Sequence, residues 1–284
     1  MPNALTNEIA RREPTDRSPA WIDLGEVRLR YETSNWSACS APIDVLIHEL
    51  GGSLESWAAI APTLSKSARV LAYDQRGHGG SAKIRAPFTL DDHVNDLAAL
   101  VDLLVPDEPL RLIAAAAGSA IAVGFAARHP LRVTSMVMCA PALNVDPSRR
   151  HLLRERAGRA IREGMSAIVD DTLERSWPQV IRDDRPLFDQ YRAQLLANDP
   201  DGYAYAALAL SDVDLTNCLP VLRCPCLLLA GQYDLQRIPE QVFAHAALIS
   251  GSVCETVPAG HLMAVQRPQD VLAKIHAFRD GNCA

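Results

Sequence analysis

An aspartate and a histidine in the C-terminal part of the chain have the types and spacing for proton transfer. Asp234 ends the stretch GQYD, and His261 ends the stretch PAGH. Each stretch follows an apolar run that predicts a buried strand. A carboxylate that holds a histidine ring in one tautomer makes that histidine an effective general base. These two residues are therefore the first candidates for catalysis.

A third candidate position lies in the segment 111–130, RLIAAAAGSAIAVGFAARHP, which predicts a strand, a tight turn and a helix. Such a turn commonly presents a nucleophilic serine in the pattern G-x-S-x-G. Here the pattern falls on residues 114–118, AAAAG, so the nucleophile position is Ala116. A methyl group cannot attack a carbonyl carbon. Ser119 is expected in the first helical turn, away from the site.

Two glycine-rich loops follow predicted strands nearer the N-terminus. In the first, HELGG (48–52), the backbone N–H of Leu50 is expected to join that of Ala117 in binding an oxyanion. In the second, YDQRGHGGS (73–81), Asp74 and Arg76 are expected to pair and hold the turn. His78 in the same loop is expected at the surface.

The elements that position these residues alternate between strand and helix. Near-continuous apolar runs predict buried strands, as in a parallel sheet covered on both faces; they span 45–50, 69–74, 110–115, 135–140 and 226–231. Helical spacing covers 89–104 and 119–130, and Thr89 with Asp92 resembles a capping box. Residues 21–33 alternate like an antiparallel hairpin at the sheet edge. The pattern predicts an α/β fold with a mostly parallel sheet flanked by helices.

The alternation stops near residue 145 and resumes near 220. The prediction is a loose tail over 1–18, a core formed by 19–144 and 219–284, and a helical lid over 145–218.

The order nucleophile position, acid, histidine resembles that of the α/β-hydrolase fold, and the likeness covers nearly all of the chain after residue 20. The stretches ERSW (174–177), YRAQLLANDPDGYAYAALALSDVDL (191–215) and LPVLRCPCLLLAGQYD (219–234) are similar to 3-oxoadipate enol-lactonases. Those enzymes hydrolyse a small acidic enol-lactone from aromatic-compound degradation. The resemblance implies lactonase or esterase chemistry and places Trp177 in the substrate pocket.

Two residues beside the expected pocket carry open alternatives. The family loop usually has glycine where this chain has Glu49. Its carboxylate either turns outward to solvent or takes part in acid–base chemistry beside the oxyanion site. Trp57 either lines the pocket floor and contacts substrate or packs the first helix.

The missing serine leaves two explanations, an inactivated form of a serine enzyme and a natural alanine. The favoured function is hydrolysis of a small, carboxylate-bearing lactone or ester. The alternative is a cofactor-free lyase or isomerase, or a hydrolase that activates water to cleave a C–C or C–N bond, with His261 and Glu49 as acid and base. The third is a pseudo-hydrolase that binds a ligand without turning it over.

Composition restricts partners and location. The formal charge of −6 over 284 residues offers no basic surface for nucleic acid or anionic membrane. The odd number of cysteines, 7, without framework spacing favours a reducing, cytoplasmic location. Cys224 and Cys226 have no second Cys/His pair nearby, so no metal is expected, and no cofactor. The expected partner is a small-molecule substrate, with a homodimer left open.

Overall fold

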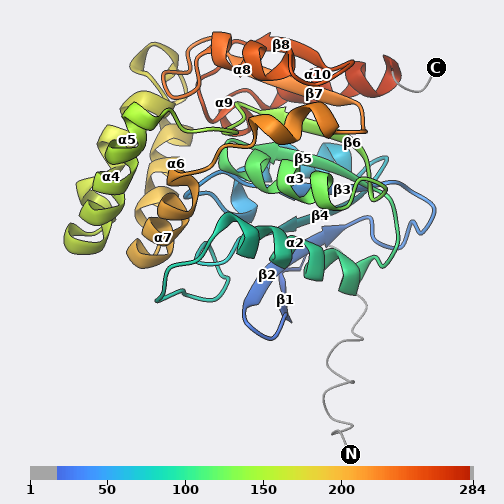
Figure 1. The fold of residues 1–284 in the computed structure, drawn as a ribbon, viewed down its shortest axis with the longest axis horizontal. Coiled ribbons are helices and arrows are strands. Elements are labelled where there is room, and N and C mark those ends of the chain that lie inside the picture. The colour runs from blue at the N-terminus through green and yellow to red at the C-terminus, as the bar shows by residue number, and fades with distance from the viewer. Residues whose placement is uncertain (1–17, 282–284) are drawn as a thin grey trace, which may run out of the picture.

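The computed structural model describes residues 18–281, and its centre is a sheet of eight strands in the order β1-β2-β4-β3-β5-β6-β7-β8 (Figure 1). The strand bounds are β1 (Ala20–Asp23), β2 (Arg28–Ser34), β3 (Ile43–Ile47), β4 (Arg69–Tyr73), β5 (Leu110–Ala115), β6 (Val133–Cys139), β7 (Cys226–Gly231) and β8 (Val253–Val257). Strands β1 and β2 are antiparallel, and β2 pairs antiparallel with β4. The remaining pairs are parallel, which confirms the predicted sheet. The predicted tail, except Ser18, lies outside the described residues.

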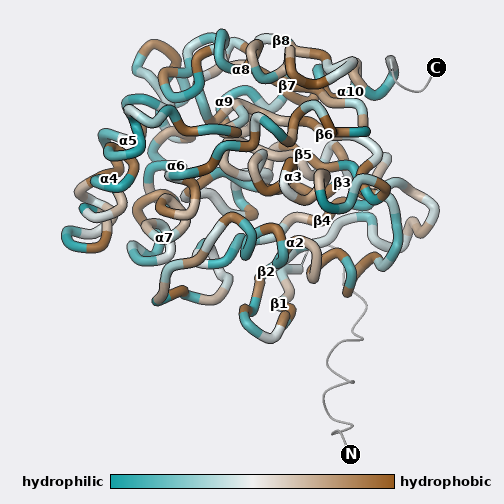
Figure 2. The backbone as a smooth tube through the Cα atoms, in the orientation of Figure 1, coloured by the Kyte–Doolittle hydropathy of each residue, from teal (hydrophilic) through white to brown (hydrophobic). Residues whose placement is uncertain are grey.

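The apolar runs become strands because helices bury them on both faces. Every residue of β3, β4 and β7 is buried. One face packs against α2 (Leu90–Leu104), α3 (Ala117–Arg128) and α8 (Pro239–Ala246). The other face packs against the short helices η3 (Leu54–Trp57), α1 (Ala61–Leu64) and α9 (Met263–Gln266), together with α10 (Pro268–Gly281). Figure 2 shows hydrophobic residues gathered around the central strands.

Helix α2 begins where its sequence predicts. The Thr89 side chain accepts a hydrogen bond from the backbone N–H of Asp92, and the Asp92 carboxylate accepts from the N–H of Thr89 at 2.7 Å. This reciprocal pair satisfies two N–H groups that have no partner within the helix. The predicted capping box is confirmed.

Between β6 and β7 the chain forms a helical insertion at one side of the sheet (Figure 1). Its helices are α4 (Arg150–Glu163), α5 (Val169–Ser176), α6 (Arg185–Leu196) and α7 (Pro200–Ser211), joined by the 3-10 turns η4 (Pro147–Arg149), η5 (Met165–Ala167) and η6 (Gln179–Ile181), with η7 (Thr216–Val221) leading back to β7. It has an apolar core of its own, which also takes in Leu262 from the loop before α9. The helical character of 145–218 agrees with the sequence, and its action as a lid stays a prediction.

Within residues 18–281, none of the helices combines the length and the apolar character needed to cross a membrane.

Candidate active site

The turn between β5 and α3 holds Ala116 in a backbone conformation that side chains rarely adopt. Its φ is 44° and its ψ is −110°. A residue with a Cβ at positive φ is strained, and such strain persists only where the surroundings hold it. Here the N–H of Ala116 donates to the carbonyl of Cys139 at 2.8 Å, and its own carbonyl accepts from Ala142 at 3.1 Å. The turn therefore has the sharp elbow shape without the serine.

Glycine is required at only one of the elbow's two glycine positions. A Cβ on Gly118 would stand 2.4 Å from the carbonyl oxygen of Ile47 and 2.6 Å from that of His48. The start of α3 thus packs directly on the end of β3. Ala114, at the other position, fits in the buried strand. This close approach brings the two proposed oxyanion donors to one cavity.

The loop after β3 is fixed by a buried histidine. The Nδ1 atom of His48 lies 2.7 Å from the carbonyl of Glu49, and its Nε2 accepts the N–H of Gln75 at 3.0 Å. Both contacts are satisfied by a neutral ring, and burial lowers the pKa of His48. Leu50 and Ala117 line the cavity, and neither backbone N–H has an acceptor among residues 18–281.

Asp234 and His261 meet as the spacing predicts. The Nδ1 atom of His261 lies 2.8 Å from Oδ2 of Asp234. The other carboxylate oxygen accepts the backbone N–H groups of Gln236 at 2.7 Å and Arg237 at 2.9 Å. Because Nδ1–H donates to the carboxylate, Nε2 is left as the basic nitrogen.

Helix α5 of the insertion anchors the histidine loop. The carbonyl of Ser176 accepts the N–H of His261 at 2.9 Å and the amide of Gln266 at 3.1 Å. A Cβ on Gly260 would stand 2.6 Å from the same carbonyl, so the glycine before the histidine allows this contact. Sequence reasoning missed Ser176, because its contribution comes from the backbone.

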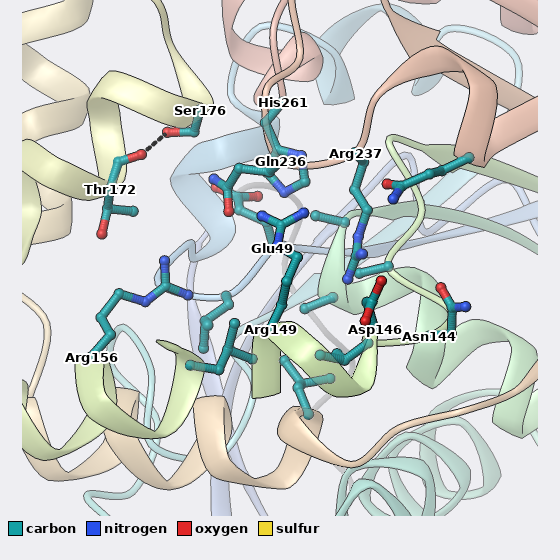
Figure 3. A pocket seen from close by; sticks show the side chains of 18 of the residues that line it. Glu49, Asn144, Asp146, Arg149, Arg156, Thr172, Ser176, Gln236, Arg237 and His261 are labelled. Atoms are coloured by element: carbon teal, nitrogen blue, oxygen red, sulfur yellow. Dashed lines mark hydrogen bonds between the residues drawn. The ribbon is translucent and has the colours of Figure 1, made fainter. Parts of the chain in front are cut away.

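A cavity of about 490 Å³ joins these parts, and His261 reaches into it (Figure 3). Its wall includes Glu49, Leu50, Ala116, Ala117, Tyr191 and His261. The histidine base, the elbow methyl and both proposed oxyanion donors thus face one partly enclosed space. A cavity of this size suits a small organic ligand.

Glu49 does not turn to solvent, so that alternative is wrong. Glu49 is 4 % exposed, and its Oε1 accepts hydrogen bonds from the Ser56 hydroxyl at 2.8 Å and from the Tyr191 hydroxyl at 2.7 Å. Oε2 has no hydrogen-bond partner among the described residues, and Glu49 is part of the cavity wall. Its carboxylate is therefore available to a ligand.

Both tryptophans pack into apolar cores, which corrects the expected substrate contact of Trp177 and decides for packing at Trp57. Trp177 donates from its indole N–H to the carbonyl of Ile181 at 3.0 Å and packs edge-on against Phe188. Trp57 is buried against the sheet with η3 and α1. Neither belongs to the wall of the cavity. Both anchor apolar cores, because a large aromatic side chain buries the most surface there.

The second glycine-rich loop also departs from expectation. Asp74 pairs with Arg30 at 2.5 Å and Arg76 pairs with Asp96 at 2.6 Å, so the expected pair between them is wrong. His78 is fully buried, and burial lowers its pKa to about 4. The loop is held by contacts with distant segments that local spacing does not reveal.

Two other residues near the elbow carry nucleophilic side chains, and both lie outside the cavity wall. Ser119 is buried in α3, as expected for a residue in the first helical turn. Cys139 ends β6 in the core, where burial raises the pKa of its thiol to about 12. A thiol of that pKa holds almost no thiolate near neutrality.

Two curated proteins are similar in sequence over most of this chain. A curated 3-oxoadipate enol-lactonase 2 from Acinetobacter baylyi is 24% identical over 247 residues, which is 86% of this chain and 90% of the relative. A putative 2-succinyl-6-hydroxy-2,4-cyclohexadiene-1-carboxylate synthase from Bacillus subtilis is 27% identical over 256 residues, 85% of this chain and 91% of the relative.

A solved enol-lactonase from Burkholderia xenovorans LB400 superposes with a TM-score of 0.86 at 28% identity, covering 92% of this chain and 100% of that one. The family model for the alpha/beta hydrolase fold matches residues 45–268. The chain therefore belongs to the α/β-hydrolase fold family and is a hydrolase of that fold.

Proposed function

We propose that this enzyme hydrolyses a small, carboxylate-bearing ester or lactone by direct attack of water. One observation carries the proposal: His261 is held by Asp234 beside a cavity whose elbow presents only the methyl group of Ala116. The base is kept and the protein nucleophile is absent. We take the alanine as natural, so water is the nucleophile that His261 activates.

The reaction balances with these groups. Nε2 of His261 takes a proton from water as the water oxygen bonds to the substrate carbonyl carbon. The oxyanion that forms accepts hydrogen bonds from the N–H groups of Leu50 and Ala117. When the C–O bond to the leaving group breaks, the imidazolium returns its proton to the departing oxygen. The products are a carboxylic acid and an alcohol or enol, without an acyl-enzyme.

The names of similar proteins support one class of substrate. Two similar proteins are named as enol-lactonases, and the sequence of the insertion resembles that group. A lactone or ester from the breakdown of aromatic compounds is therefore the substrate class we favour.

A second candidate rests on the carboxylate of Glu49 in the cavity wall. Oε1 is held by Ser56 and Tyr191, which leaves Oε2 to exchange a proton with a ligand. Together with His261 it would serve a cofactor-free lyase or isomerase, and one similar protein is named as a putative synthase.

The test is a turnover panel of lactones, esters and 2-oxo acids with the wild type and a His261→Ala variant. Ester or lactone hydrolysis that disappears in the variant supports the proposal. Turnover that survives in His261→Ala would refute it. Turnover confined to C–C bonds or to isomerisation would support the second candidate, and no turnover would favour a binding role.

A further inference from the structure

Three arginines of the cavity wall have no acidic partner. Arg149 ends η4, Arg156 lies on α4, and Arg237 follows β7. Within residues 18–281, none of their side chains forms an ion pair or donates a hydrogen bond, and Nε of Arg156 is buried without a partner. By contrast, Arg154 on the same helix pairs with Asp212 at 2.7 Å. The guanidinium donors of the three are thus unused.

Arg149 lies close enough to Arg237 for the two cations to repel each other. Burial lowers the pKa of Arg237 to about 10, and the charge of Arg149 adds to that effect. Burial likewise lowers the pKa of Arg175 on α5, with contributions from Arg149 and Arg156. Gathering unpaired cations in a partly enclosed space is unfavourable unless an anion joins them.

Three carboxylates near the cavity accept hydrogen bonds from groups other than these arginines. Asp234 accepts from His261 and from two backbone N–H groups. Glu49 accepts from two hydroxyl groups. Asp146 at the cavity edge accepts the N–H of Ser148 at 2.8 Å. They reduce the net positive charge of the region, but they do not occupy the three guanidinium groups.

The arginines form a row across the cavity, and Figure 3 shows Arg149 between Arg156 and Arg237. Arg149 and Arg156 also line an adjoining hollow of about 270 Å³, whose wall includes Arg175. Arg149 and Arg156 therefore stand at the junction of two spaces.

We propose that Arg149, Arg156 and Arg237 form a subsite that binds both carboxylates of one dianionic substrate, a dicarboxylic ester or lactone. A guanidinium group presents a planar fork of donors that fits a carboxylate on each edge. One carboxylate on each side of Arg149 would bridge neighbouring arginines and satisfy all three. The part of this inference that places the substrate's scissile carbonyl beside His261 rests on the proposed function.

The first experiment measures binding, which does not depend on turnover. Wild-type protein is titrated by calorimetry with succinate, glutarate and longer dicarboxylates, with monocarboxylates and diamides of the same chain length, and with inorganic phosphate. We expect one dicarboxylate to bind at least about tenfold more tightly than its monocarboxylate, because its second carboxylate accepts further charged hydrogen bonds from the arginines. Equal affinity for the two would overturn the inference. Phosphate binding as tight as the best dicarboxylate would overturn it in favour of a site for a single dianion.

Variants locate the site. Arg156→Gln and Arg237→Gln should each weaken dicarboxylate binding at least about tenfold and bring it close to the monocarboxylate value. Arg162→Gln removes an exposed charge from the same helix and should leave the affinity unchanged. Circular dichroism checks that each variant is folded. If both cavity variants fold and keep the wild-type affinity, the subsite is refuted; an equal loss in Arg162→Gln would reduce the effect to general electrostatics and also refute it.

A further variant separates this inference from the proposed function. His261→Ala should keep dicarboxylate binding and lose hydrolysis. Dicarboxylate binding without turnover of any ester or lactone would leave the subsite standing and remove the proposed function. Hydrolysis of monocarboxylate esters or lactones without tighter binding of dicarboxylates would remove the subsite and leave the proposed function standing.

Discussion

The hydroxyl of Tyr191 on α6 donates a 2.7 Å hydrogen bond to Oε1 of Glu49, which joins the helical insertion to the loop after β3. The two residues are 142 positions apart, and both line the cavity. A buried carboxylate beside the proposed oxyanion donors would oppose negative charge forming there. If water attacks directly, replacing the Glu49 carboxylate by a neutral group is therefore not expected to reduce the rate strongly.

We expect Glu49→Gln to keep ester or lactone hydrolysis within about tenfold of wild type, because the amide preserves the side chain's volume and an acceptor for Tyr191. Steady-state kcat and KM measure this. A loss of more than a hundredfold in a folded variant would contradict it and assign Glu49 to the chemistry.

Tyr191→Phe should lower the free energy of unfolding by about 1–2 kcal/mol, measured by urea denaturation.

Asp234→Asn should lower kcat by about 10²–10⁴-fold with little change in KM, because an amide no longer fixes the tautomer that leaves Nε2 of His261 basic. The matched control is Asp183→Asn, which breaks the surface pair with Arg267 and should leave kcat unchanged. An Asp234→Asn variant that is folded and fully active would mean that His261 needs no carboxylate.

Ala116→Ser should leave the natural reaction unchanged or slow it, because the hydroxyl would occupy space beside His261 that the water nucleophile needs. Wild-type protein should resist serine-directed phosphonates and show no acyl-enzyme by mass spectrometry during turnover. The backbone strain is the same for both side chains, so stability should stay within about 0.5 kcal/mol. A gain of orders of magnitude in hydrolysis would show instead that the alanine replaces a catalytic serine.

The sequence reveals what depends on local pattern and chain order. Buried apolar runs identify the strands, and Thr89 marks the start of α2 from its own neighbours. Asp234 and His261 are found because each follows a strand, and the carboxyl ends of parallel strands meet at one edge of a sheet.

What the sequence leaves undetermined depends on which surfaces meet. Trp177 gives the same local pattern whether it faces substrate or Phe188. The burial of Glu49 depends on a tyrosine far along the chain. The arginines of η4 and α4 look like an ordinary solvated face, and only packing brings two of them into the same cavity wall as Arg237. Contacts of this kind are set by tertiary structure, so spacing carries no signal for them.

The free energy of unfolding should fall at acid pH because of three buried histidines. Burial lowers the pKa of His78 to about 4 and also lowers the pKa values of His48 and His93. Between the unfolded value of about 6.5 and the folded value, the unfolded chain binds the proton and the folded chain does not. Stability is therefore full above pH 6.5 and falls as the pH drops toward 4.

For His78 alone, the free energy of unfolding should fall by about 2 kcal/mol between pH 7 and pH 5. His78→Asn keeps a donor for the carbonyl of Arg76, which lies 3.1 Å from Nδ1 of the histidine, and removes the titrating group. Urea denaturation at both pH values should show a smaller fall in this variant than in wild type. His276→Asn, at an exposed position on α10, should fall as wild type does. If His78→Asn loses as much stability as wild type over this range, its ring is not the group that takes up the proton on unfolding.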